Sequence, residues 1–258
     1  MSRNPFDLTG KVAVVTGSGR GLGKGAALAL GAAGAKVVTS SRTLSEAEAT
    51  AQVIRDGGGD AAAFAVDITD RADCTRLVDN AVERYGGLDV MVCNAASNLH
   101  GPALELSADD WTRCIEVELT GYFFAAQAAG VQMARQEAGG AIVMISANSS
   151  VVGYSELITT AAAKGGVDQM CRNLAVEWGG RNIRVNSMNP GYTEHLPPAG
   201  DVKPGDSDDI EADLRRLTPL PRRGRVEEFA WPVVFLASDA ASFVTGQNLM
   251  VDGGYSIK

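Results

Sequence analysis

The chain has 258 residues, of which 45% are hydrophobic and 21% are charged. That length is enough to bury the core of one large domain, and the composition excludes a disordered or fibrous chain. Lysine and arginine together number 23 against 31 aspartate and glutamate residues, which gives a formal net charge of −8. The electrostatic field of this negative charge repels phosphate backbones and anionic lipid surfaces, so nucleic acids and membranes are poor partners.

The four cysteines are Cys74, Cys93, Cys114 and Cys171. Their wide spacing matches neither a CxxC metal site nor a disulfide-dense secreted module, so we expect reduced, buried thiols and no metal site. No signal-peptide pattern opens the chain, and no apolar run reaches the roughly 18 residues of a membrane span. We therefore expect a soluble cytoplasmic protein.

Taken in chain order, seven short runs rich in β-branched residues predict strands, and helical patterns separate them. The predicted strands are residues 11–16, 36–40, 61–66, 88–93, 141–146, 183–186 and 248–251. Several are continuously apolar, as expected of parallel strands that helices cover on both faces. The sequence therefore predicts one α/β domain over residues 1–258, built on a doubly wound, parallel, seven-stranded Rossmann-like sheet.

One stretch departs from this alternation of strand and helix patterns. Residues 194–209 contain the proline pair Pro197-Pro198, the proline–glycine pair Pro204-Gly205 and several aspartates. They precede a predicted helix over residues 210–217. An irregular segment of this length is typical of a loop that closes over a ligand. We expect residues 194–217 to form a substrate lid.

The first predicted strand runs through a glycine-rich turn into an Ala/Leu-rich helix. Glycines let the backbone approach a ligand closely, and the N–H groups that open a helix can receive a pyrophosphate. The strand before and the helix after favour a dinucleotide cradle over a plain tight turn. We assign to this cradle Gly17, Gly19, Arg20, Gly21, Leu22 and Gly23.

The end of the second strand decides which dinucleotide is preferred. A carboxylate there would accept hydrogen bonds from the 2′-hydroxyl of the adenine ribose in NAD(H). The sequence instead has Ser41 followed by Arg42. Arg42 and Arg20 can bracket a 2′-phosphate through charge-assisted hydrogen bonds, so we expect NADP(H) to be preferred over NAD(H). The alternative is that both arginines are solvated surface residues.

With these motifs the whole chain resembles the short-chain dehydrogenase/reductase family. The cradle looks like that family's cofactor signature, Cys93-Asn94-Ala95-Ala96 resembles its Asn-Asn-Ala-Gly segment, and the last strand resembles its subunit-contact region. The resemblance implies a nicotinamide-dependent oxidoreductase that acts on a small molecule and is commonly a tetramer. It also implies cofactor contacts by Asp67, Ile68, Asn94, Ala95, Pro190, Gly191 and Thr193.

The family's catalytic pattern is incomplete in this chain. The resemblance implies a Tyr-x-x-x-Lys pair, a serine thirteen residues before the tyrosine, and an asparagine on the preceding helix. Lys164 is present, but Thr160, Ala147 and Glu118 stand in the other three places. A threonine hydroxyl is too weak an acid to replace a phenol, and alanine cannot polarise a substrate oxygen. Lys164 is expected to bind the ribose on the nicotinamide side.

Other groups are candidates for the missing proton donor. Glu118 either pairs with Lys164 or turns to water, and the sequence favours neither. Thr160 resembles the small hydroxyl residue of the dienoyl-CoA reductase branch, but that branch has a tyrosine where this chain has Ser149. Tyr154 is more readily interpreted as a wall of the cleft. The catalytic candidates are therefore Lys164, Thr160, Glu118 and Ser149.

Three functions remain open from the sequence. The first is an NADP(H)-dependent oxidoreductase with an altered proton donor, acting on an activated C=C or a carbonyl. The second is an NADP(H)-binding sensor or partner subunit without turnover. The third is a non-redox lyase or isomerase with Glu118 or Lys164 as base. In each case the helices predicted over residues 119–137 and 160–178, with their Ala/Gly-rich faces, resemble the family's subunit-contact helices. This resemblance implies a homo-oligomer, specifically a tetramer.

Overall fold

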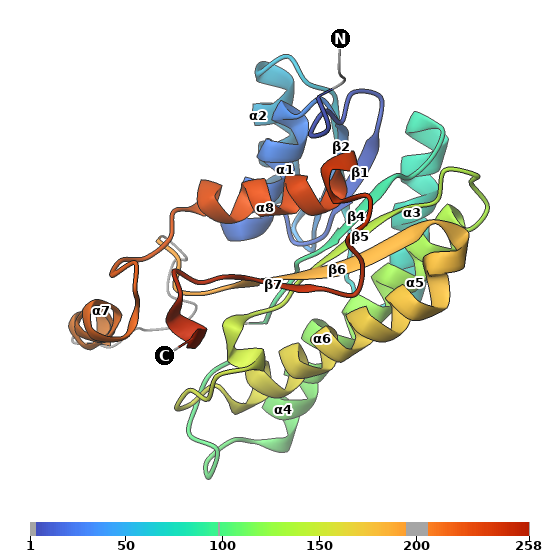
Figure 1. Ribbon diagram of the computed structural model, residues 1–258. Helices are drawn as coiled ribbons and strands as arrows, with labels where there is room; N and C mark the ends of the chain where they lie inside the picture. Colours follow the sequence, from blue (N-terminus) through green and yellow to red (C-terminus); the bar gives the residue numbers. More distant parts are fainter. Residues whose placement is uncertain (1–3, 98, 195–205, 258) are drawn as a thin grey trace.

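The computed structural model describes residues 4–97, 99–194 and 206–257. Its strands form one parallel sheet in the order β3-β2-β1-β4-β5-β6-β7 (Figure 1). They are β1 (Val12–Val15), β2 (Lys36–Ser41), β3 (Ala61–Ala65), β4 (Val90–Cys93), β5 (Gly140–Ile145), β6 (Ile183–Pro190) and β7 (Asn248–Val251). The predicted doubly wound, seven-stranded sheet in a single domain is confirmed.

Helices cover both faces of the sheet. Those of eight or more residues are α1 (Gly21–Ala32), α2 (Leu44–Asp56), α3 (Arg71–Tyr85), α4 (Ala108–Ile115), α5 (Gly121–Met133), α6 (Ile158–Trp178), α7 (Asp206–Leu217) and α8 (Val226–Ala237). Figure 1 shows α1, α2 and α8 on one side of the sheet and α3, α5 and α6 on the other. Alternate residues of each strand therefore serve different cores: in β1, Val12 and Val14 pack with α3 and α5, whereas Ala13 and Val15 pack with α1 and α8.

The strand order reverses between β1 and β4. The chain moves outward from β1 through β2 to β3, and then returns to place β4 on the other side of β1. At such a switch point the loops after neighbouring strands separate, and the crevice between them is where ligands bind in doubly wound sheets. The loops that follow β1, β4, β5 and β6 open at this edge.

Three helices differ from their predicted bounds. The helix predicted over residues 160–178 begins two residues earlier, at Ile158. The helix predicted over residues 119–137 begins with a single π-helical turn, η1 (Glu116–Thr120), which joins α4 to α5, and α5 ends at Met133. The helix predicted over residues 210–217 starts four residues earlier, at Asp206. Most of the irregular part of the predicted lid, residues 195–205, lies outside the described residues.

The cysteines are all free and buried, as expected. Burial raises the pKa of the Cys74 thiol to about 12, with the nearby Asp70 and Asp67 adding to the effect, so this thiol is not a nucleophile at neutral pH. Among the described residues no cluster of His, Cys, Asp and Glu is arranged to hold a metal ion. Within the same residues, no helix combines the length and the apolar character needed to cross a bilayer.

Candidate functional site

The cradle after β1 is shaped for close approach of a ligand to the backbone. Gly17 and Gly21 have φ of 64° and 56°, in the left-handed region that favours glycine. A Cβ atom on Gly23 would collide with the side-chain amide of Asn94 and the carbonyl oxygen of Gly17. Asn94 in turn donates from Nδ2 to the carbonyl oxygens of Thr16 (3.1 Å) and Gly17 (3.0 Å). The end of β4 thereby fixes the cradle in place.

A cleft of about 680 Å³ runs from the cradle along the carboxyl edge of the sheet. It brings together every predicted cofactor residue except Gly23, which lies beneath the cradle. The predicted residues that line it are Gly17, Gly19, Arg20, Gly21, Leu22, Ser41, Arg42, Asp67, Ile68, Asn94, Ala95, Pro190, Gly191 and Thr193. The four catalytic candidates, Glu118, Ser149, Thr160 and Lys164, line the same cleft.

Glu46 adds an acidic group to the adenine-ribose end that sequence reasoning missed. Arg20 and Arg42 are both exposed there, as their predicted role requires. Glu46 lines the same end of the cleft, and its Oε2 accepts a hydrogen bond of 3.1 Å from Ser41 Oγ. The carboxylate lies in the first turn of α2, five residues beyond the end of β2. The residues at the strand end alone therefore do not reveal it.

Lys164 is held by a cage of oxygen atoms at the inner end of the cleft. Its Nζ donates to Tyr122 Oη (3.0 Å) and to the Ile145 carbonyl oxygen (2.9 Å), and lies 3.5 Å from Glu118 Oε2. Burial acts to lower the pKa of Lys164, but the nearby Tyr122 and Glu118 leave it raised, so the amine is an ammonium. Each ammonium proton therefore has an acceptor within the protein.

The Tyr122 phenol is part of that cage and was also missed from the sequence. Its ring is fully buried, and Oη donates to the Ile145 carbonyl oxygen at 3.0 Å. Burial raises the pKa of Tyr122 to about 12, so the group stays neutral and serves as a hydrogen-bonding partner of Lys164. Its position four residues after Glu118 is the one sequence signal that could have suggested it.

Glu118 is buried and paired, which is one of the two alternatives left open by the sequence. Its side chain is 1% exposed and extends from the π-helical turn η1 toward Lys164. Besides that ion pair, Oε1 accepts hydrogen bonds from Ser97 N (3.0 Å) and Ser97 Oγ (2.7 Å). Ser97 follows β4 and lines the cleft. Sequence reasoning did not select Ser97, because only the tertiary fold brings it to Glu118.

Two other hydroxyls in the cleft are buried without a protein partner. Ser149 Oγ and Thr160 Oγ1 make no hydrogen bond within the described part of the chain. Buried hydroxyls are costly to leave unpaired, so both are available to a molecule bound in the cleft. Ala147, which lies near them, contributes no polar side chain.

Tyr154 forms an aromatic wall at the mouth of the cleft. Its ring stacks on Tyr255 (centroids 5.5 Å apart, planes at 15°) and meets Tyr192 edge-on at 6.0 Å. Its Oη accepts a hydrogen bond of 2.7 Å from Asn148 Nδ2. Burial raises the pKa of Tyr154 far above its usual range, so this phenol is not a proton donor suited to neutral pH.

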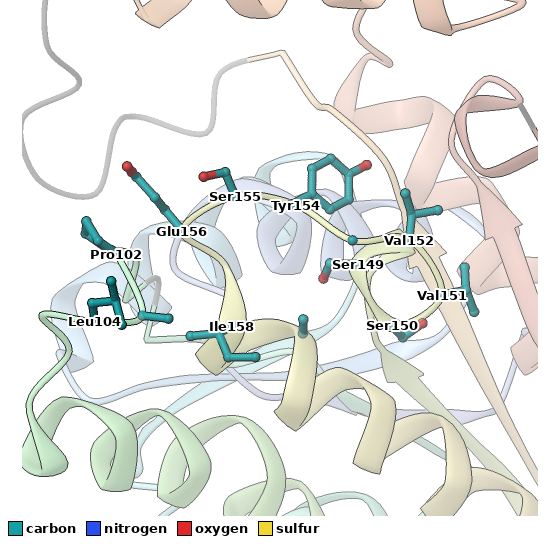
Figure 2. Close-up of a pocket in the computed structure, with 13 residues that line it drawn as sticks. Pro102, Leu104, Ser149, Ser150, Val151, Val152, Tyr154, Ser155, Glu156 and Ile158 are labelled. Atoms are coloured by element: carbon teal, nitrogen blue, oxygen red, sulfur yellow. The ribbon is translucent and has the colours of Figure 1, made fainter.

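A second cavity of about 760 Å³ adjoins this wall. Figure 2 shows Pro102 and Leu104 on one side of it, Val151 and Val152 on the other, and Ser149 between them. Ser149 and Tyr154 line both cavities. A mainly apolar pocket thus meets the polar cleft at a free hydroxyl.

Comparisons with known proteins agree with this architecture. A family model described as enoyl-(acyl carrier protein) reductase matches residues 17–256. The trans-4-hydroxycyclohexanecarboxylate dehydrogenase of Sinomonas cyclohexanicum is 38% identical, over 98% of this chain and 96% of that protein. A short-chain type dehydrogenase/reductase from Mycobacterium marinum superposes with a TM-score of 0.91 at 32% identity, over 98% of each chain. The gluconate 5-dehydrogenase from Burkholderia cenocepacia J2315, in complex with NADP and tartrate, superposes with a TM-score of 0.92 at 33% identity, again over 98% of each chain.

Proposed function

The chain belongs to the short-chain dehydrogenase/reductase family of oxidoreductases, and from that premise we propose that it is an NADP(H)-dependent enzyme acting on a carbonyl, its alcohol, or an activated C=C. The observation that carries the proposal is the continuous cleft. It leads from a glycine cradle fit for a pyrophosphate to the buried Lys164–Glu118 pair and two unpaired hydroxyls. The NADP in the structure of the Burkholderia relative supports the choice of cofactor.

The residues present fit a nicotinamide dinucleotide. A side chain at Gly23 would displace the Asn94 amide that braces the cradle, and the glycines leave backbone N–H groups accessible at the start of α1. Arg20 and Arg42 would hold a 2′-phosphate, with Asp67 and Ile68 beside the adenine. The bound nicotinamide would supply or accept the hydride.

The nicotinamide end of the cleft is assigned to Pro190, Gly191 and Thr193, which follow β6. Lys164 lies at the floor of this end. For its ammonium to reach a ribose hydroxyl, one of its three protein acceptors must be replaced.

The substrate end of the cleft combines one apolar wall with free hydroxyl groups. Ser149 can donate to a substrate oxygen from the place where the two cavities meet, a task that Ala147 cannot perform. Thr160 supplies a second donor, but neither hydroxyl is acidic enough to act as the sole proton source. A relative named for a hydroxycyclohexanecarboxylate supports a secondary alcohol or its ketone as the reacting group.

The test is steady-state turnover with a panel of alcohols, ketones, enones and enoyl thioesters. We expect NADPH oxidation or NADP⁺ reduction with at least one class of substrate, at a rate above that of the cofactor alone. A protein that binds NADP(H) but turns over none of these classes would contradict the proposal.

That result would favour the second candidate, an NADP(H)-binding sensor or partner subunit. Its supporting observation is the saturated Lys164 ammonium, which in this structure has Tyr122, Ile145 and Glu118 as acceptors. A binding protein needs the cradle but no acid, and the missing phenol at Thr160 is compatible with that role.

A further inference from the structure

Ser97 lies where the open cleft meets the buried charges. It is half-buried, lines the cleft, and donates to Glu118 Oε1 from both Oγ (2.7 Å) and N (3.0 Å). The Glu118 side chain itself is 1% exposed. The Ser97 hydroxyl therefore connects this carboxylate to the space where a substrate would lie.

Glu118 is surrounded by one ammonium group and by hydrogen-bond donors that pair with its carboxylate. Lys164 lies 3.5 Å from Oε2, and Tyr122 accepts from the same ammonium. Cys114 of α4 and His100 of the loop after β4 are two further titratable groups that interact with Glu118. A carboxylate beside one ammonium is a stronger base than a hydroxyl and is available at neutral pH.

We propose that Ser97 and Glu118 form a two-residue proton relay that takes the place of the family's tyrosine. The proposal rests on the oxidoreductase function above and names the proton path for that function. Ser97 is the catalytic residue that touches the substrate oxygen. Glu118 is the proton reservoir. Lys164 is the positioning residue that pairs with Glu118, and Tyr122 in turn holds Lys164.

In alcohol oxidation, every proton and electron pair that leaves the substrate has an acceptor. The substrate O–H bond breaks and its proton forms a new O–H bond at Ser97 Oγ, while the original Ser97 proton moves to Glu118 Oε1. The electron pair of the substrate C–H bond leaves as hydride to the oxidised nicotinamide of the proposed function, and the C=O bond forms. Reduction runs the same transfers backwards, starting from protonated Glu118.

The relay is regenerated through the same hydroxyl. After oxidation Ser97 is unchanged and Glu118 carries one extra proton. That proton returns through Ser97 Oγ to water once the product leaves, because Ser97 lines the cleft and Glu118 has little exposure of its own. Exchange with bulk water therefore depends on Ser97.

The first test compares Ser97→Ala, Ser97→Thr and Glu118→Gln with the native enzyme. General acid–base groups contribute typically 10²- to 10⁴-fold, so we expect kcat to fall by about 10²-fold or more in Ser97→Ala and Glu118→Gln. Ser97→Thr, which keeps the hydroxyl, should recover most of the rate. In the two Ser97 variants the Kd for NADP(H) should stay within about twofold, because Ser97 is not assigned to the cofactor and does not contact Lys164.

Matched controls are available on the surface. Ser242→Ala removes an exposed serine hydroxyl after α8, and Glu83→Gln neutralises an exposed glutamate on α3. Neither residue lines the described cavities, so both variants should keep native kcat.

The second readout does not require turnover. In ¹³C spectra of carboxyl-labelled glutamate, the Glu118 signal is the one that Glu118→Gln removes. Ser97→Ala removes a hydrogen bond that stabilises the carboxylate, so the titration midpoint of that signal should rise. The control variant Ser242→Ala should leave the titration midpoint of the Glu118 signal unchanged.

The outcomes separate the relay from the function on which it rests. An active native enzyme whose Ser97→Ala variant keeps its kcat, or whose Glu118 midpoint does not respond to that change, overturns the relay alone. A native protein with no turnover overturns the proposed function and the relay with it. Loss of kcat together with the shifted midpoint supports both.

Discussion

Arg42 and Glu46 place opposite charges at the same end of the cleft. Arg42 with Arg20 favours a 2′-phosphate, while the Glu46 carboxylate, 3.1 Å from Ser41 Oγ, repels one. Both arginines have exposed side chains that can extend over a phosphate, and the carboxylate already has a hydrogen-bond donor in Ser41. Because two cations oppose one anion at this end of the cleft, we propose that NADP(H) is preferred over NAD(H).

Replacement of Arg42 by aspartate tests this balance. Hydrogen bonds between charged groups contribute about 1.5–3 kcal/mol, so Arg42→Asp should reduce the preference for NADP(H) at least tenfold. The measurement is a fluorescence titration of native protein and variant with NADPH and NADH at one ionic strength. If the native protein bound the two cofactors equally, the assigned role of Arg42 would be wrong.

A second residue-scale prediction concerns the positions where the family pattern is lost. Thr160→Tyr with Ala147→Ser should supply a phenol beside Lys164 and a group that polarises the substrate oxygen. In this double variant the reaction no longer needs Glu118, so adding Glu118→Asn should leave ketone reduction intact. In the native background, Glu118→Asn alone should lower it by about 10²-fold.

The measurement is NADPH oxidation with small activated ketones at saturating cofactor. Comparing the four proteins gives a double-mutant cycle, in which the two changes should be strongly non-additive. Equal losses from Glu118→Asn in both backgrounds would mean that Glu118 has a purely structural role.

At this scale most residues assigned to the cofactor could be proposed from the sequence because they fall in short local motifs. The cradle lies within a single turn, and Ser41 and Arg42 lie together at one strand end. Glu46, Ser97 and Tyr122 were not predictable in the same way. Ser97 is 21 residues from Glu118 along the chain, and only the packing of η1 against the loop after β4 brings their oxygens to 2.7 Å.

At the scale of elements, a buried hydrogen-bond network ties the loop after β5 to its neighbours. Asn189 of β6 donates from Nδ2 to Asp168 Oδ2 (2.9 Å) on α6, to Ser150 Oγ (3.0 Å) and to the Ala147 carbonyl oxygen (3.2 Å). Asp168 is buried and also accepts from Ser187 Oγ at 3.1 Å. One amide group therefore positions the loop that carries Ser149.

Asn189→Ala should destabilise the protein by about 2–4 kcal/mol, because it leaves the buried Asp168 with fewer donors. For a chain of this size that corresponds to a fall in Tm of very roughly 4–16 °C. Calorimetry of Asn189→Ala against Asn173→Ala, a change on the exposed face of α6, measures the difference. A Tm as close to native as that of the control would show that the network carries little of the stability.

The sequence predicted where the helices and strands lie more closely than it predicted the residues at which they begin and end. The alternation of apolar strands and helical patterns located all seven strands. The π-helical turn η1 was missed because Glu116–Thr120 has no residue pattern that separates a π-turn from an α-helix. Its effect is functional, since it is the element that carries Glu118 to Lys164.

At the scale of the whole molecule, we propose that the chain assembles as a homotetramer. Phe123 and Val131 of α5 and Val176 of α6 are large hydrophobic residues that remain exposed in the single chain. Burial of such faces between symmetric copies would account for them. Sedimentation equilibrium at micromolar concentration should give about four times the mass of one chain, which is 26.9 kDa. The mass of one chain would contradict this prediction.

The central claim is that this cleft transfers a hydride between NADP(H) and a substrate carbon. Its most direct test is to supply NADPH deuterated at C4 of the nicotinamide, once on each face, and to analyse the product by mass spectrometry. Because a dinucleotide fixed by the cradle can turn only one face of its nicotinamide ring toward the substrate, we predict one deuterium per product molecule from one of the two cofactors and none from the other. Consumption of substrate with no deuterium in the product from either cofactor would contradict the account.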